Sequence, residues 1–318
     1  MADIAEAATE AVTRRPRERR RFHSLRSHWD LYLIMVPGLL YFIIYKYVPM
    51  WGIVIAFQNY SVFSGISGSD WVGLQHFKTM FGNSDFYRIF TNTLLISIYK
   101  LIWGFPGPII LAIMLNEIRN MLYKRSIQTL VYLPHFLSWI IVGGIMVNVL
   151  SPSSGVVNQL ITMLGFEPIY FLTDPDWFRS ILVISDIWKE VGWGAIIYLA
   201  AIAGIDPQLY EAAIMDGAGK FRQIIHITLP AMMGVIVILF LLRLGHVLDV
   251  GFEQIFVLYN PLVYEVSDVI ETYVYRVGIQ QAKFSFTTAV GLFKAVIGLL
   301  LVMMANRGAK KLGQEGIW

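Results

Sequence analysis

The chain alternates between long apolar stretches and shorter polar segments. A helix that crosses a bilayer needs about 20 mostly apolar residues, and six stretches reach that length. The pattern therefore predicts an all-α integral membrane protein with about six transmembrane helices. The predicted spans are 31–57, 86–115, 128–150, 178–203, 231–258 and 286–305.

Lysine and arginine are distributed unevenly between the polar segments. Alternate segments fall into two groups, one holding 15 of these residues and the other 3. Because positively charged loops stay in the cytoplasm, the first group and both chain termini are predicted to be cytoplasmic. The inner segments are 1–30, 116–127, 204–230 and 306–318, and the outer segments are 58–85, 151–177 and 259–285.

The first 30 residues form a basic arm, with seven arginines between positions 14 and 26. Directly before an apolar stretch, such a run favours a cytoplasmic flank over a nucleic-acid-binding arm. That stretch is too long for a signal-peptide core, so we expect it to stay as a membrane anchor. The predicted organisation is an arm over 1–30, a transmembrane domain over 31–305 and a cytoplasmic tail over 306–318.

Composition agrees with a membrane protein and excludes some chemistry. Apolar residues make up 56% of the chain and charged residues 15%, whereas soluble domains carry about a quarter charged residues. The absence of cysteine excludes disulfides and thiol catalysis, and the six histidines, His135 among them, lack metal-ligand spacing. No metal site and no catalytic residue is predicted.

Two short helices are predicted outside the spans. In the first outer segment, Trp71, Leu74, Phe77, Met80 and Phe81 fall on one helical face, which indicates a helix lying in the outer interface. The second is part of an elbow in the inner segment 204–230. There Asp206 is an N-cap and Pro207 the first helical residue, and the helix runs to about Asp216. Glycines then interrupt it, and a further helical stretch from Lys220 is expected to end near Pro230.

The elbow carries a motif. Glu-Ala-Ala is followed after three residues by glycine, and after nine more by Ile-Thr-Leu-Pro. This pattern resembles the EAA signature of binding-protein-dependent import permeases of the ATP-binding cassette (ABC) type. The matching positions are Glu211, Ala212, Ala213, Asp216, Gly217, Ile227, Leu229 and Pro230.

The resemblance extends over nearly the whole chain after Leu25. The stretches 45–52, 56–57, 71–74 and 314–318 are similar to the LplB-type branch of MalF-like sugar permeases, which serve polysaccharides and complex sugars. Within that branch the chain is similar to the first permease subunit of bacterial alginate importers.

The resemblance implies a type I ABC importer permease fold in the bacterial inner membrane. It implies a second homologous permease (a second copy or a different chain), two cytoplasmic ATPases and an external solute-binding protein, with no nucleic acid. The elbow would be the coupling helix, with Glu211 paired to a basic residue of the ATPase. The sequence has no GxxxxGK[S/T] loop. We therefore expect no cofactor on this chain and no enzymatic activity of its own, with ATP and magnesium used by the ATPase subunits.

Polar residues inside the predicted spans are candidates for the substrate path, because each charge at mid-membrane costs about 2.5–3.5 kcal/mol. Aromatic residues there could stack on sugar rings or serve packing. The excess of basic over acidic residues in the spans suggests an anionic oligosaccharide such as a uronate. The candidates are Lys100, Asn148, Trp188, Glu190, Trp193, Tyr198, Arg243, His246 and Asp249.

In a continuous fifth span, Arg243, His246, Asp249 and Glu253 would share one helical face. This stripe is either an ion-paired packing device, with Arg243 bound to Asp249 or to a partner chain, or a hydrophilic passage. Two other functions are considered for the protein. A membrane-embedded polysaccharide enzyme would need a catalytic inner loop. An ion-coupled secondary transporter would carry an internal repeat and would not depend on ATP. The sequence shows neither feature.

Overall fold

The computed structural model describes residues 29–311 and residue 313. Most of the predicted arm and the end of the tail lie outside these residues. The described chain divides into two units, which meet after Val54 and are considered separately. The first unit is helical from Trp29 onward. Its elements are α3 (Trp29–Phe42), the π-helix η1 (Ile43–Tyr47), α4 (Val48–Met50) and the 3₁₀-helix η2 (Trp51–Phe57), which continues into the second unit.

Three helices continue past a proline by means of a π-helical turn. A proline inside an α-helix removes one backbone hydrogen bond and its ring clashes with the preceding turn. A π-turn places one extra residue there and relieves the clash. The turn η5 (Ile224–Thr228) lies two residues before Pro230, so the second helix of the elbow does not end there as predicted. It runs from Lys220 to Gly245.

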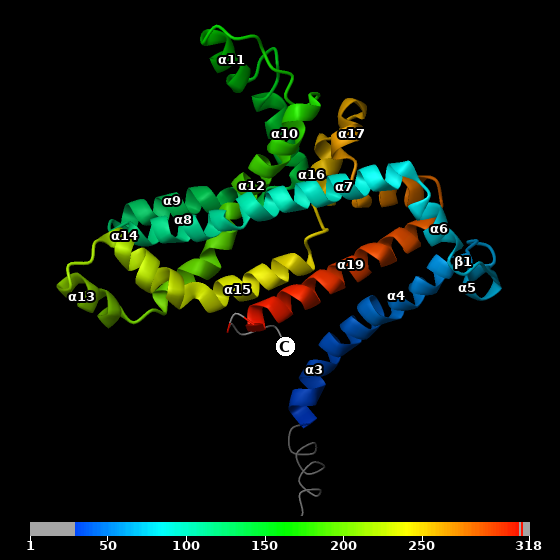
Figure 1. Cartoon of the computed structure of the whole chain (residues 1–318), viewed down its shortest axis with the longest axis horizontal. Coiled ribbons are helices and arrows are strands. Elements are labelled where there is room, and N and C mark those ends of the chain that lie inside the picture. Colours follow the sequence, from blue (N-terminus) through cyan, green and yellow to red (C-terminus); the bar gives the residue numbers. More distant parts are fainter. Residues whose placement is uncertain (1–28, 312, 314–318) are drawn as a thin grey trace, which may run out of the picture. The chain divides into compact units, whose positions relative to one another are not determined.

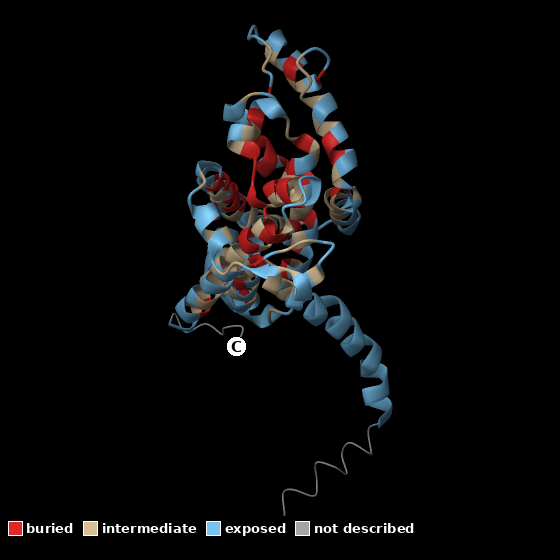
Figure 2. Ribbon diagram, turned by 90° about the vertical axis from the view of Figure 1, so that its right-hand side faces the viewer, coloured by how far each residue is buried: buried red, intermediate tan, exposed pale blue. Residues whose placement is uncertain are grey.

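The second unit is built around α12 (Pro175–Ala203), which packs against helices on both sides (Figure 1). Its glycines allow close approach, as in many membrane bundles. A Cβ at Gly192 would lie 1.9 Å from the carbonyl oxygen of Val131, and one at Gly194 would lie 2.9 Å from Pro108. Buried residues gather in the interior of this unit (Figure 2). The helices around α12 are α7 (Ser84–Tyr99), η3 (Lys100–Gly104), α8 (Pro106–Glu117), α9 (Met121–Tyr132) and α15 (Leu229–Gly245).

The all-α membrane fold is confirmed. In the described chain four helices are long and apolar enough to cross a membrane, and a bent pair would make a fifth. The predicted fourth span is the 29-residue helix α12, whose apolar sequence is interrupted by Asp186, Lys189 and Glu190. The four helices are Trp29–Phe57, Ser84–Glu117, Lys220–Gly245 and Phe284–Lys311, and the last of them is α19.

Two predicted spans are not continuous helices. The segment 128–150 bends by 105° between η4 (Leu133–Phe136) and α10 (Trp139–Val149), where Ser138 caps the second helix. The segment 231–258 breaks after Gly245 and resumes as α16 (Phe252–Leu258). Gly251 has φ 93°, a conformation that favours glycine and cannot continue an α-helix.

The predicted outer segments hold short elements. The helix expected around residues 71–81 is shorter than predicted, because Trp71 lies in a strand and Leu74 caps α6. Met80 of α6 is buried against α7 and α19, so α6 is packed on the protein. The elements are β1 (Gln58–Asn59) paired antiparallel with β2 (Asp70–Trp71), α5 (Gly65–Gly68), α6 (Gln75–Phe81), α11 (Val156–Met163), η6 (Pro261–Val263), α17 (Tyr264–Ser267), α18 (Ile270–Tyr273) and η7 (Val274–Gln280).

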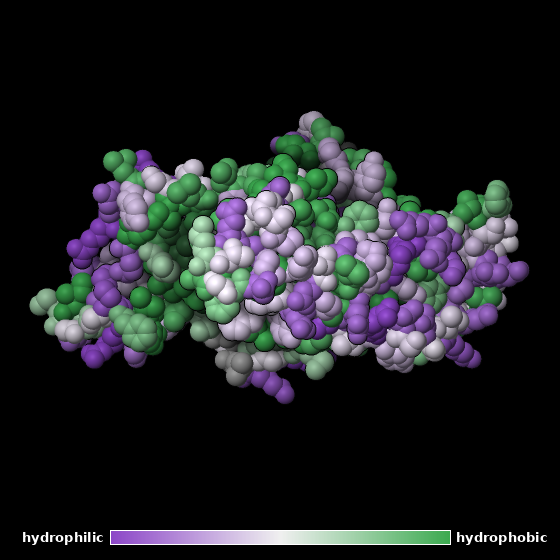
Figure 3. Space-filling view, turned by 90° about the horizontal axis from the view of Figure 1, so that it is seen from above, coloured by the Kyte–Doolittle hydropathy of each residue, from purple (hydrophilic) through white to green (hydrophobic). Residues whose placement is uncertain are grey.

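The elbow forms one end of the second unit, with α13 (Pro207–Met215) and α14 (Lys220–Gln223). In Figure 3, hydrophilic residues gather at that end and hydrophobic residues cover much of the surface beside it. The apolar surface beside the elbow suits contact with lipid, and the hydrophilic end suits contact with water.

Candidate functional site

The elbow folds as its sequence predicts at its first helix. The Asp206 carboxylate accepts a hydrogen bond from the backbone N–H of Gln208 at 2.9 Å, and Pro207 opens α13. The helix ends where Gly217 adopts φ 72° and Ala218 N–H donates to the Ala213 carbonyl at 2.8 Å. A Cβ at Gly217 would meet nothing within 4 Å. Glycine is therefore favoured there by backbone conformation, not by lack of space.

The motif divides into two structural groups. Glu211, Ala212, Asp216 and Gly217 are exposed on α13 and its end, and Ala213 is half-buried. Ile227, Leu229 and Pro230 lie in η5 and the start of α15, at the base of the elbow.

Apolar side chains are exposed along the elbow. Leu209, Ile214 and Met215 are all exposed, and Met215 is 87% accessible. Their helix is held to the base by a hydrogen bond between the hydroxyls of Tyr210 and Thr228 at 2.9 Å. A short, fixed helix that exposes several apolar side chains is suited to contact with another protein.

A cavity of about 420 Å³ lies between α12, η3, α8, α15 and the break that follows α15. It gathers six of the nine residues predicted for the substrate path. The other three lie elsewhere: Asn148 bonds within α10, Trp188 is exposed on α12 outside the lining, and His246 is 76% exposed in the break. The six that line the cavity are Lys100, Glu190, Trp193, Tyr198, Arg243 and Asp249.

Lys100 is buried at one end of this cavity and fully bonded. Its ammonium group donates to Asp186 at 2.9 Å, to the Val250 carbonyl at 2.8 Å and to the Gln254 side chain. Only 4% of Lys100 is exposed. An ammonium group so buried requires such partners, because desolvation of a charge costs several kcal/mol. Lys100 therefore fixes the break to the neighbouring helices and has no donor left for a ligand.

The break itself carries further ion pairs. Asp249 binds Lys294 of α19 at 2.6 Å and His246 at 3.0 Å, and Lys294 also binds Glu271 at 3.1 Å. The predicted stripe on one helical face is wrong, because residues 246–251 leave the helix. Within the described residues Arg243 does not pair with Asp249, and its alternative pairing with a partner chain stays a prediction.

Arg243 differs from the other cations around the cavity. Its nearest carboxylate is Asp186, at 3.9 Å, and 48% of its side chain is exposed. Asp186 is already bound closely by Lys100. The Arg243 guanidinium therefore keeps hydrogen-bond donors that can serve a ligand in the cavity.

The other end of the cavity is aromatic. Trp193 stacks face to face on the imidazole of His135, with ring centroids 4.5 Å apart and an interplanar angle of 2°. His135 Nδ1 lies 2.7 Å from one oxygen of Glu190, and Lys189 donates to the other oxygen at 3.0 Å. The Lys189 ammonium also lies over the ring of Trp139, which lines the cavity. The two tryptophans are thus held in place by a polar cluster.

Three residues of this site were not among the predicted path residues: Asp186, His135 and Trp139. Asp186, Glu190 and Trp193 are four and three residues apart on α12, a spacing that could have added Asp186 to the candidates. Trp139 and His135 carry no such signal: His135 lies in η4, which packs against α12 from a distant part of the chain, and Trp139 follows the 105° bend after η4. Among the described residues, no group of three histidines or carboxylates could hold a metal ion.

Three known proteins are similar to this chain over most of its length. The polygalacturonan/rhamnogalacturonan transport system permease protein YteP of Bacillus subtilis is 49% identical over 99% of this chain and 98% of its own length. Protein LplB of the same organism is 52% identical over 92% of each chain. A chain of a bacterial alginate ABC transporter, solved with an alginate pentasaccharide-bound periplasmic protein, is 44% identical. It superposes with a TM-score of 0.86 over 94% of this chain and all of its own.

Residues 104–313 match one protein family, and this stretch contains the elbow and most of the cavity. With about half of its residues identical to two curated relatives, the chain belongs to the binding-protein-dependent transport system inner membrane components, the permeases of ABC sugar importers.

Proposed function

We propose that this chain forms one half of the pore of an ATP-driven importer for an acidic oligosaccharide. The observation that carries the proposal is the cavity, with tryptophans at one end and the incompletely paired Arg243 at the other. A pyranose ring offers an apolar face to an indole, and a uronate adds a carboxylate that a guanidinium binds with two hydrogen bonds. Trp193 is the proposed stacking surface and Arg243 the proposed carboxylate ligand.

Related proteins support this substrate class. YteP is named for polygalacturonan and rhamnogalacturonan, and the similar solved transporter for alginate. All three polymers contain uronate units. We infer that this chain takes short fragments of such a polymer from an external solute-binding protein, with which the alginate transporter was solved in complex.

The elbow is the proposed connection to the energy source. Its exposed apolar helix would dock on a cytoplasmic ABC ATPase, with Glu211 binding a basic residue there. The complete transporter would hold a second homologous permease and two ATPases. ATP and magnesium would act on the ATPases, and this chain would contribute no catalytic group. Both termini would be cytoplasmic, as the distribution of Lys and Arg predicts.

Uptake into proteoliposomes tests the proposal. The complete transporter would be reconstituted with its binding protein and supplied with labelled digalacturonate and, separately, with the neutral digalactoside. We expect uptake of the acidic sugar only, and only with ATP enclosed on the cytoplasmic side. Uptake that continues without ATP, or that is equal for the neutral sugar, would contradict the proposal.

A further inference from the structure

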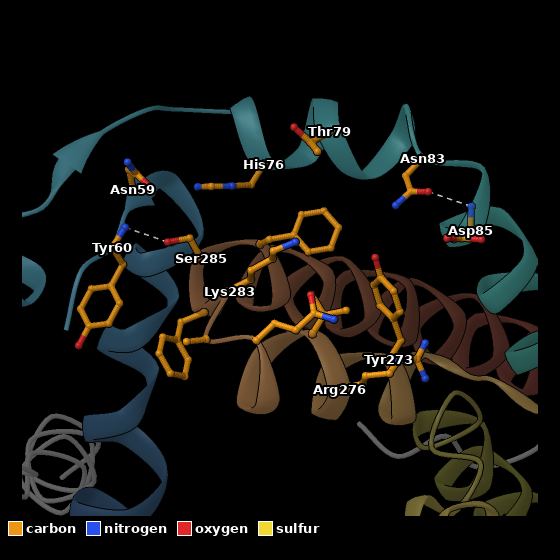
Figure 4. A pocket seen from close by; sticks show the side chains of 15 residues that line it. Asn59, Tyr60, His76, Thr79, Asn83, Asp85, Tyr273, Arg276, Lys283 and Ser285 are labelled. Atoms are coloured by element: carbon orange, nitrogen blue, oxygen red, sulfur yellow. Dashed lines mark hydrogen bonds between the residues drawn. The ribbon is translucent and has the colours of Figure 1, made fainter. Parts of the chain in front are cut away.

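A second cavity, of about 600 Å³, lies between two segments that are both predicted to be external. Helix α6 and the residues after it form one wall. The end of η7 and the first residues of α19 form the other (Figure 4). None of its lining residues also lines the cavity proposed for the substrate path.

A fixed turn holds a lysine at this cavity. Ala282 has φ 54°, a conformation unfavourable for a residue with a side chain, and Lys283 follows it. The Lys283 N–H donates to the Val277 carbonyl at 3.2 Å, and its carbonyl accepts from the backbone N–H and the hydroxyl of Thr287. These bonds on both sides keep the turn in place. The position of Lys283 on the wall is therefore built into the fold.

Lys283 supplies positive charge that the cavity does not neutralise. Its side chain is exposed and, within the part of the chain that the structure describes, forms no ion pair. The other charged groups of the lining are paired: Arg276 with Asp268, and Asp85 with Arg88 at 2.9 Å. The cavity is thus suited to a ligand that carries one negative charge.

Neutral hydrogen-bond donors on the walls also lack acceptors among the described residues. Tyr273 is only 7% exposed, its hydroxyl points into the cavity, and burial raises the pKa of Tyr273, so the hydroxyl keeps its proton (Figure 4). The Asn83 side-chain oxygen accepts from Asp85 N–H, which leaves its amide N–H₂ available. Ser285 accepts from Tyr60 N–H and can still donate its hydroxyl proton.

We propose that this cavity is a second, external binding site for one acidic sugar unit of the transported oligosaccharide. The carboxylate would bind Lys283, and ring hydroxyls and ring oxygens would accept from Tyr273, Asn83 and Ser285. The inference rests on the function proposed above. A single carboxylate side chain from another protein would satisfy Lys283 alone, whereas a sugar ring carries oxygens in several directions and matches donors on both walls. The volume lies within the usual range for ligand sites.

The absence of cysteine from the chain allows a direct test by labelling. Thr79 lines the cavity, is exposed and bonds only to its own helix, so Thr79→Cys is a reporter outside the proposed ligand set. Its neighbour Lys78 is exposed but lies outside the lining, so Lys78→Cys is the matched control. The complete transporter, without binding protein, would be treated with a charged methanethiosulfonate reagent, and labelling of this chain would be followed.

Digalacturonate at about ten times its Kd should slow the labelling of Thr79→Cys by about tenfold, because about a tenth of the sites then stay unoccupied, and leave Lys78→Cys unchanged. The neutral digalactoside should protect much less. Adding Lys283→Gln should abolish the protection, whereas Lys283→Arg should preserve it. Loss of protection in both Lys283 variants would contradict the role of the charge.

Three results would overturn the inference. If vesicles import the acidic sugar but Thr79→Cys is not protected, the second site is wrong and the proposed function stands. If sugar-free binding protein protects Thr79→Cys and digalacturonate does not, the cavity is a protein contact. If the vesicles import no acidic oligosaccharide, the proposed function fails and this inference fails with it.

Discussion

At the scale of single residues, the charged groups inside the membrane differ in how completely they are paired. Lys100 has three partners and belongs to the packing, whereas Arg243 is only loosely associated with Asp186 and faces the cavity. Sequence reasoning placed both among the path residues because it could see only that each is charged and lies in a span. Their partners come from other helices, so only the structure separates the two.

Replacing Arg243 should change substrate selection. Arg243→Gln removes a charge-assisted hydrogen bond of about 1.5–3 kcal/mol to a bound carboxylate, so the KM for digalacturonate should rise by roughly 10–100-fold. Uptake assays in proteoliposomes would measure this. Lys78→Gln is the control, because it removes an exposed cation that lines neither cavity. An unchanged KM in Arg243→Gln would exclude Arg243 as the carboxylate ligand.

Trp193 should contribute to binding through stacking. An aromatic contact is worth about 0.5–1.5 kcal/mol beyond the area it buries, so Trp193→Ala should raise KM by roughly tenfold and Trp193→Phe by less. His135→Ala would leave the indole in place without its stacked neighbour and should give an intermediate effect. If Trp193→Ala transports normally, the proposed stacking surface is wrong.

Lys100 should matter for stability more than for substrate affinity. Lys100→Met leaves the Asp186 carboxylate and Gln254 buried without their main partner, a loss of about 3–5 kcal/mol for a broken buried pair. The midpoint of thermal unfolding in detergent should fall clearly. The KM of the protein that remains folded should rise less than in Arg243→Gln, because Lys100 has no donor left for a substrate. A large rise in KM with unchanged thermal stability would instead assign Lys100 to the substrate.

At the scale of elements, breaks in the helices position the site. The bend at residues 137–138 brings Trp139 against α12, and the break at 246–251 brings Asp249 to the cavity. The prolines and glycines at these places are visible in the sequence, but which of them interrupts a span is not. Pro230 lies in a continuous helix because a π-turn precedes it, whereas the segment around Gly251 opens.

The elbow provides a test of coupling at this scale. Gly217→Leu forces a branched side chain into a left-handed conformation, at a cost of about 1–2 kcal/mol, and should reorient the two helices of the elbow. We expect transport and substrate-stimulated ATP hydrolysis to fall together, while the amount of protein in the membrane is unchanged. Gly219→Ala is the matched control, because Gly219 has φ −70° and nothing within 4 Å of an added Cβ. Full activity of Gly217→Leu would count against the coupling role.

At the scale of the whole molecule, the two proposed binding sites have different surroundings. The cavity with Trp193 and Arg243 lies between long helices, and the one with Lys283 is lined mainly by residues of the predicted outer segments. If the predicted orientation holds, an external membrane-impermeant thiol reagent should label Lys283→Cys and not Arg119→Cys, in the inner segment 116–127, in intact cells. Both residues are exposed and neither belongs to the elbow, so the side of the membrane decides the result. Labelling of Arg119→Cys alone would reverse the orientation.

The sequence by itself determined that the chain is a helical membrane protein, because hydrophobic length and charge are properties of local segments. It also located the elbow and its N-cap, since a cap, a glycine in the left-handed region and the helix between them lie within a dozen residues. Only the tertiary structure decided which of the predicted path residues line one cavity. It alone shows that Arg243 keeps free hydrogen-bond donors and that Lys283 lines a second cavity. Burial and pairing depend on contacts between residues far apart in the chain, and these contacts exist only once the helices have packed.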